Sequence, residues 1–183
     1  MCVTEGRIGP IRSREAVVRH ILIRAGKVTI RARLLATPTA DRIWSALPIS
    51  GPAQTWGKEV YFRTPISQDA EPDARIVVSK GEIAFWPDGD AITIGFGATP
   101  ISKRGEIRFT SKCNVWAVAI DDVDQLRHVY PGEQVSITEA ELIGDGKTWA
   151  ASAKLRDKHI APATVICGAT VLCPSVDESG TSG

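Results

Sequence analysis

Long apolar runs are missing from this chain. No stretch approaches the ~20 consecutive apolar residues that span a bilayer, and residues Met1 to Arg7 lack the apolar segment of a secretory signal peptide. A charge excess of one sign is missing too, because 22 Lys and Arg oppose 21 Asp and Glu. Such a chain has no overall field that attracts nucleic acid or an anionic membrane. We therefore expect a cytoplasmic protein with neither as a partner.

Motifs that hold metals or build catalytic nucleophiles are also absent. The cysteines form no Cys-x-x-Cys pair, and His20, His128 and His159 form no His-x-x-x-His pattern. Neither a Gly-x-Ser-x-Gly elbow nor a Gly-x-x-x-x-Gly-Lys-Ser/Thr loop occurs. We expect no metal and no cofactor, and no residue is marked as a covalent nucleophile.

The four cysteines, Cys2, Cys113, Cys167 and Cys173, are expected to be free thiols in a reducing compartment. A bridge between Cys167 and Cys173 is the alternative. The sequence does not decide between them.

Short strands separated by glycine and proline turns fill most of the 183 residues. Clean alternation of apolar and polar residues predicts a strand over 27–34, which forms a hairpin with 16–24. Further strands are expected where period-two patterns or apolar runs recur, at 56–62, 76–78, 82–86, 91–96, 113–120, 134–140, 149–155 and 164–172. Thr37 and Pro38 begin the one clear helix, which Pro48 ends, and 121–129 is a second, short helix.

This pattern predicts a mainly β protein, a small closed or nearly closed barrel with one or two short helices. We expect a single domain over 16–174, with flexible segments at 1–15 and 175–183. Between Ile92, Ile94 and Phe96, the residues Ala91, Thr93 and Gly95 leave one strand face thin. Such a face lets another backbone approach closely.

One motif, Trp56-Gly57-Lys58-Glu59-Val60-Tyr61-Phe62, resembles a signature of small bacterial and archaeal cyclophilin-like proteins. Other fragments follow in the order and approximate spacing of that family: Thr64-Pro65, Gly81-Glu82-Ile83, Phe85-Trp86-Pro87-x-Gly89, Phe96-Gly97-x-Thr99-Pro100 and Asn114-Val115. The resemblance covers about 16–140 and leaves an extension from Glu141. It implies a cyclophilin-like barrel but no settled activity.

Peptidyl-prolyl isomerases of the cyclophilin type carry Phe-His-Arg and Gln-Gly-Gly-Asp segments, and neither occurs here. Arg63 and Arg108 stand outside any such pattern. Because a fold does not confer an activity, the isomerase role is not carried over.

The candidate ligand-binding residues are Trp56, Glu59, Tyr61, Trp86 and Thr99. A carboxylate among aromatic residues can have a raised pKa and transfer protons, or it can simply fix a loop through hydrogen bonds. Trp86 beside Pro87 is either a groove wall or a cap over the barrel. The loop around Thr99 is either an anion site or an ordinary turn.

Three functions remain open at this stage. The first is binding of a small molecule or short peptide in a groove lined by the five candidate residues. The second is an enzyme, either a prolyl isomerase or an amide-directed catalyst that uses Glu59. The third is an assembly module in which the strand at 164–172 pairs with a second copy to form a homodimer.

Overall fold

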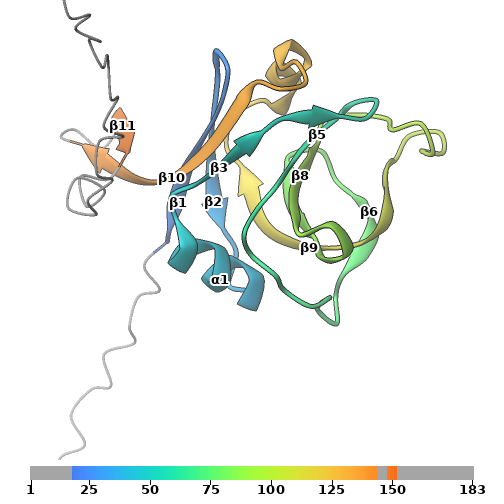
Figure 1. Ribbon diagram of the computed structural model, residues 1–183, viewed down its shortest axis with the longest axis horizontal. Coiled ribbons are helices and arrows are strands. Elements are labelled where there is room, and N and C mark those ends of the chain that lie inside the picture. Colours follow the sequence, from blue (N-terminus) through green and yellow to red (C-terminus); the bar gives the residue numbers. More distant parts are fainter. Residues whose placement is uncertain (1–17, 144–147, 152–183) are drawn as a thin grey trace, which may run out of the picture.

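The computed structural model describes residues 18–143 and 148–151, which form one antiparallel sheet of eleven strands (Figure 1). The strands are β1 (His20–Ala25), β2 (Val28–Leu34), β3 (Ile49–Pro52), β4 (Gln54–Thr55), β5 (Glu59–Arg63), β6 (Arg75–Val78), β7 (Glu82–Trp86), β8 (Ala91–Gly95), β9 (Ile107–Ala119), β10 (Gln134–Ile143) and β11 (Thr148–Ala151). One α-helix, α1 (Pro38–Ala46), and two 3-10 turns, η1 (Pro87–Gly89) and η2 (Val123–His128), complete the secondary structure.

The sheet curls into a nearly closed barrel. Its strands follow the order β11-β10-β1-β2-β9-β7-β8-β5-β4. β3 pairs with β10, and β4, one residue further along the chain, pairs with β5. The segment 49–55 therefore links the two sides of the sheet, although no single ladder closes it. The predicted mainly β, barrel-like fold is confirmed.

The barrel interior holds the main core. Alternate residues of β1 and β2 point inward, among them Ile21, Ile23 and Ile30. Strands β5, β7 and β8 add Phe62, Phe85, Ile92 and neighbouring aliphatic residues, and β9 adds Trp116. This alternation follows from strand geometry, in which successive side chains point to opposite faces.

The helix α1 forms where the sequence predicts it and covers one end of the barrel (Figure 1). The Thr37 hydroxyl accepts a hydrogen bond from the backbone N–H of Ala40 (3.2 Å), and Pro38 begins the helix. Ala40, Ile43 and Leu47 pack into the core. At the other end, η2 is the predicted second short helix and buries Val123 and Leu126.

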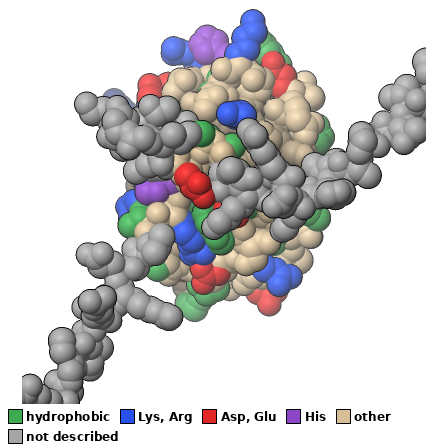
Figure 2. Space-filling model, turned by 90° about the vertical axis from the view of Figure 1, so that its left-hand side faces the viewer, with side chains coloured by type: hydrophobic (Ala, Val, Ile, Leu, Met, Phe, Trp, Pro, Cys, Tyr) green, Lys and Arg blue, Asp and Glu red, His purple; other side chains and the backbone are tan. Residues whose placement is uncertain are grey.

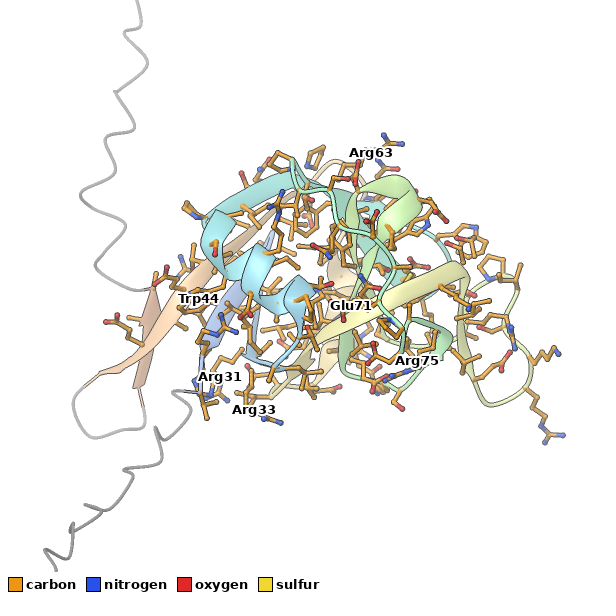
Figure 3. The ribbon with its side chains drawn as sticks, turned by 90° about the horizontal axis from the view of Figure 1, so that it is seen from below. Arg31, Arg33, Trp44, Arg63, Glu71 and Arg75 are labelled. Carbon is orange, nitrogen blue, oxygen red and sulfur yellow. The ribbon has the colours of Figure 1, made fainter. Side chains whose placement is uncertain are left out.

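A second set of contacts fixes the loop 66–74 beside α1 (Figure 3). The fully buried Asn114 accepts a hydrogen bond from the backbone N–H of Glu71 and donates to Thr39 and to the carbonyl of Asp69. The Glu71 carboxylate accepts from the hydroxyl and backbone N–H of Thr39. These contacts give Asn114 a structural role.

Several predicted boundaries need correction. Trp56 to Lys58 form a turn, so the strand predicted over 56–62 begins only at Glu59. The strand expected at 113–120 begins earlier, at Ile107. Strands β3 and β4 were not predicted. The predicted strand at 164–172, the proposed flexible ends, and Cys2, Cys167 and Cys173 all lie outside the described residues.

Outside the barrel lies a second, smaller cluster, which we call the outer cluster: Val78, Ala84, Ile107, Phe109, Cys113 and Val115. The outer cluster forms because β9 is long enough to extend past the barrel. The second half of β9 pairs with β2 and β7, while its first half pairs with β6. In Figure 1, β6 lies on the far side of β8 from β1 and β2.

The start of β9 can pack against the outer face of β8 because that face carries small side chains, as predicted. A Cβ atom at Gly95 would lie 2.5 Å from Cγ2 of Ile107 and 3.3 Å from Cε1 of Phe109. Only glycine therefore leaves enough room for the start of β9. The neighbours at this face are the side chains of Ile107 and Phe109, whereas the sequence had suggested another backbone.

Charged side chains of both signs are interspersed on the face shown in Figure 2. Among the described residues, no helix is long and apolar enough to cross a membrane.

Candidate ligand pocket on the outer face of the barrel

A pocket of about 180 Å³ lies between the outer face of β5 and β8 and the first half of β9. Four of the five candidate residues line it, namely Trp56, Glu59, Tyr61 and Trp86. The remaining lining residues are Thr93, Phe109, Thr110 and Cys113. Residues that are up to 57 positions apart, from Trp56 to Cys113, thus meet in one place.

Strand β5 places Glu59 and Tyr61 on the side away from the main core. Its other residues, Val60 and Phe62, are buried inside the barrel, as the period-two alternation predicts. The Tyr61 hydroxyl donates a hydrogen bond to Gln54 on the neighbouring β4 (2.8 Å). This bond orients the ring at the side of the pocket.

Glu59 is a buried carboxylic acid, only 8% exposed. Burial raises its pKa above the ordinary value, and a hydrogen bond donated by the Thr93 hydroxyl (2.5 Å) acts in the opposite direction. Thr93 lies on β8, directly beside β5. A carboxyl group in this position can exchange a proton nearer to neutral pH than an exposed glutamate.

Trp56 is held by a tight turn whose shape depends on Gly57. Gly57 has a φ of +62°, and a Cβ there would lie 2.9 Å from Cδ of Pro100 and 3.1 Å from the carbonyl oxygen of Ala98. The backbone N–H of Trp56 donates to the carbonyl of Glu59 (3.0 Å). The turn is therefore clamped between the 98–100 loop and β5.

Trp86 is placed by packing against the turn that follows it. A Cβ at Gly89 would lie between 2.5 and 2.9 Å from three atoms of the Trp86 ring, so the ring rests on the backbone of η1. The Trp86 Nε1 atom is buried without a hydrogen-bond partner among the described residues. Because the ring packs against the outer cluster, Trp86 is a wall of the pocket rather than a cap over the barrel.

Thr99, the fifth candidate, does not line this pocket. Its hydroxyl donates to the carbonyl of Arg108 (2.5 Å), and its backbone N–H donates to the Ser102 hydroxyl (2.9 Å). These bonds use the polar groups that would otherwise meet an anion, so the loop is an ordered turn. Thr99 supports the pocket indirectly, because Gly57 packs on this loop.

Four lining residues were not among the predicted candidates: Thr93, Phe109, Thr110 and Cys113. The last three come from the first half of β9, where Arg108, Ser111 and Lys112 interrupt the apolar pattern. Burial, together with the negative charges of Glu59 and Asp88, raises the pKa of the Cys113 thiol to about 12. Cys113 therefore remains a neutral thiol at physiological pH and is no activated nucleophile.

Comparison with known proteins agrees with this architecture. The cyclophilin-like family matches residues 19–138 of the chain. The chain belongs to the cyclophilin-like family. The solution structure of a hypothetical protein from Archaeoglobus fulgidus is similar, with a TM-score of 0.57 and 33% sequence identity; the match covers 66% of this chain and 94% of that chain. No curated protein matches the sequence.

In this cyclophilin-like domain, the two arginines singled out in the sequence lie away from the pocket. Arg63 is exposed at the end of β5 and is labelled in Figure 3, and Arg108 pairs with Glu106 (2.6 Å). Neither lines the pocket. An arginine that polarises a prolyl amide is thus not provided by either residue.

The pocket also offers no set of metal ligands. Within residues 18–143 and 148–151, no group of three or more His, Cys, Asp and Glu residues is close enough to hold a metal ion. The chemistry available from its lining residues is proton exchange by Glu59, hydrogen bonding by hydroxyl groups, and contact with aromatic rings.

Proposed function

We propose that this cyclophilin-like domain binds a small organic molecule in the outer pocket, with Trp56, Glu59, Tyr61 and Trp86 as its main contacts. The observation that carries the proposal is the buried Glu59 carboxyl group at the wall of an otherwise mostly apolar pocket. Burying a carboxyl group opposes folding, so packing alone does not account for Glu59 at this position. Pockets with apolar walls and a few convergent polar groups are typical ligand sites.

The dimensions of the pocket favour a small molecule or a single side chain over a long peptide. A dry cavity of ~150 Å³ accommodates benzene. The outer pocket, at about 180 Å³, therefore takes one ring or one branched group of similar size. A short peptide would insert one residue and leave the rest outside.

A thermal-shift series tests this proposal. We would measure the melting temperature of the full chain with phenol, benzamide and N-acetylproline amide, because a ligand of the folded state raises it. We expect at least one of these probes to raise it in the wild type and to lose this effect in Tyr61→Ala and Trp86→Ala, which remove aromatic walls of the pocket. Tyr130→Ala, which removes an exposed ring outside the pocket, is the control and should respond like the wild type.

Two results would overturn the proposal. One is the absence of any shift with every probe at millimolar concentration. The other is a shift of equal size in the wild type and in both pocket variants, because the probe would then bind elsewhere. Saturable quenching of tryptophan fluorescence is an independent readout, since two tryptophans line the pocket.

The enzymatic alternative stays a prediction. A protease-coupled proline-peptide assay tests the isomerase form of it, and a rate equal to background would exclude that form. Homodimer formation through 164–172 is likewise a prediction, and light scattering that shows only monomer at high protein concentration would contradict it.

A further inference from the structure

The outer pocket combines a carboxylate with an unusual number of aromatic rings. Four of its eight lining residues are aromatic, namely Trp56, Tyr61, Trp86 and Phe109. Aromatic rings carry negative potential on their faces and attract organic cations. The Glu59 carboxylate adds a full negative charge when ionised.

Within the part of the chain that the structure describes, no positive charge balances Glu59 in this pocket. None of the lining residues is Lys, Arg or His, and none of the ion pairs found among the described residues includes Glu59. Its neighbour Lys58 lines a separate hollow with Phe96, Asp124 and Arg127. The wall of the outer pocket is therefore negative whenever Glu59 is ionised, and the described residues supply no counter-ion for it.

The negative charge of Glu59 also acts on Cys113. After burial, the largest cause of its raised pKa is the negative charge of Glu59, followed by that of Asp88 on η1. Two carboxylates thus act on one side chain of the pocket wall. A ligand with a positive charge would be stabilised by the same potential that disfavours the thiolate.

We propose that the ligand of the outer pocket is an organic ammonium cation, with its charged head group seated between the Glu59 carboxylate and the surrounding aromatic rings. This inference rests on the proposed function and specifies the class of ligand. A quaternary or methylated ammonium head is similar in size to benzene, so the volume of the pocket suits it. Such a group has a charge that is weakly hydrated, which makes its transfer from water to an aromatic site favourable.

The decisive experiment compares two molecules of the same shape. Choline carries a trimethylammonium group, and 3,3-dimethylbutan-1-ol carries a neutral tert-butyl group in its place. Binding of each to the full chain is followed by tryptophan fluorescence and melting temperature, with ionic strength held constant by sodium chloride. We expect choline to bind about tenfold more tightly than the alcohol, or better.

Variants locate the source of this preference. Glu59→Gln should remove most of the preference for choline while leaving binding of the neutral alcohol unchanged. Asp88→Asn should reduce the preference by a smaller factor, because the charge of Asp88 raises the pKa of Cys113 in the pocket wall less than the charge of Glu59 does. Asp73→Asn, which removes an exposed carboxylate outside the pocket, should behave like the wild type.

The possible failures are distinguishable. If the alcohol binds as tightly as choline or more tightly, the ligand is neutral, so the cation proposal is wrong while the proposed binding site stands. If neither molecule binds, the cation proposal is also wrong, and the phenol, benzamide and prolyl probes then decide whether the pocket binds anything. This comparison uses only wild-type protein, so it does not depend on whether any variant folds.

Discussion

Strands β5 and β8 have two faces with different chemistry. The inner face carries Val60, Phe62, Ile92 and Ile94, all of which belong to the main core. The outer face carries Glu59, Tyr61 and Thr93, which line the pocket. Hydrophobic burial explains every residue of the inner face.

Burial alone does not explain the outer face. Glu59 and Thr93 are almost as inaccessible as the core residues, at 8% and 1% exposure, yet both are polar. Their hydrogen bond to each other satisfies part of their polarity. The inner face contributes to stability, and ligand binding is the role that we propose for the outer face.

The largest expected effect comes from adjacent substitutions on opposite faces. Phe62→Ala should lower the free energy of unfolding by about 3–5 kcal/mol, because it leaves a cavity in the barrel core. Tyr61→Ala, one residue earlier, should cost only about 1 kcal/mol, since its side chain is partly exposed. Urea unfolding of both variants measures the two values.

For ligand binding, we expect Tyr61→Ala to have a larger effect than Phe62→Ala. Tyr61→Ala removes an aromatic wall of the pocket, so its affinity for any bound probe should fall even though the protein remains folded. A Tyr61→Ala variant as unstable as Phe62→Ala would break the distinction between the two faces. It would show that the outer residues also hold the barrel together.

A smaller effect is expected from two glycines with left-handed backbone conformations. Gly57→Ala and Gly105→Ala should each lower the free energy of unfolding by about 1–2 kcal/mol, because both glycines have a positive φ. Only Gly57 has close neighbours, in the 98–100 loop, whereas nothing lies within 4 Å of a Cβ at Gly105. Gly57→Ala should therefore be the more destabilised variant in urea unfolding.

Only the Gly57 substitution should also affect the pocket, because displacing its turn moves Trp56. The tryptophan fluorescence response to a pocket probe should weaken in Gly57→Ala and stay normal in Gly105→Ala. Equal behaviour of the two variants would mean that the 98–100 loop does not position Trp56.

The barrel could be predicted from the sequence because its inner face obeys simple alternation. Residues 27–34 and the two arms at 82–86 and 91–96 show an alternating pattern or a clear turn, and the structure places them as expected. The helix could be predicted as well, because Thr37 and Pro38 are strong signals for a helix start. In each case, the local pattern and the tertiary contacts agree.

The start of β9 could not be predicted for a physical reason. Between Ile107 and Cys113, charged and polar residues interrupt the apolar positions, and the strand pairs only with the short β6. Its residues Ile107 and Phe109 pack against Gly95 of β8, and a local pattern does not reveal this contact. Consequently, local patterns did not identify Phe109, Thr110 and Cys113, which are three of the eight lining residues.

The candidate site was partly predictable because a sequence motif concentrates its residues. Trp56, Glu59 and Tyr61 lie within six residues of one another, and Trp86 follows in a recognisable hairpin. The prediction of Thr99 as a lining residue did not hold, because sequence position does not show whether a hydroxyl group faces a ligand or bonds to its own loop.

The smallest expected effect concerns Glu59 itself, and its sign separates a binding role from a structural one. Burial raises the pKa of Glu59 in the folded state, so folding favours the protonated form. The stability it contributes is fully present below the ordinary glutamate pKa of about 4.3. It is lost as the pH rises through the raised folded-state pKa.

Glu59→Gln removes the loss of stability that accompanies ionisation of Glu59. Its amide keeps an oxygen that can accept the hydrogen bond from Thr93. We therefore expect the variant to be at least as stable as the wild type at neutral pH, with an advantage that grows as the pH rises and then levels off. Urea unfolding between about pH 4 and pH 8 would show this. If Glu59→Gln is instead less stable at neutral pH, the carboxylate is fixing the barrel, and the outer face is not distinct from the core it covers.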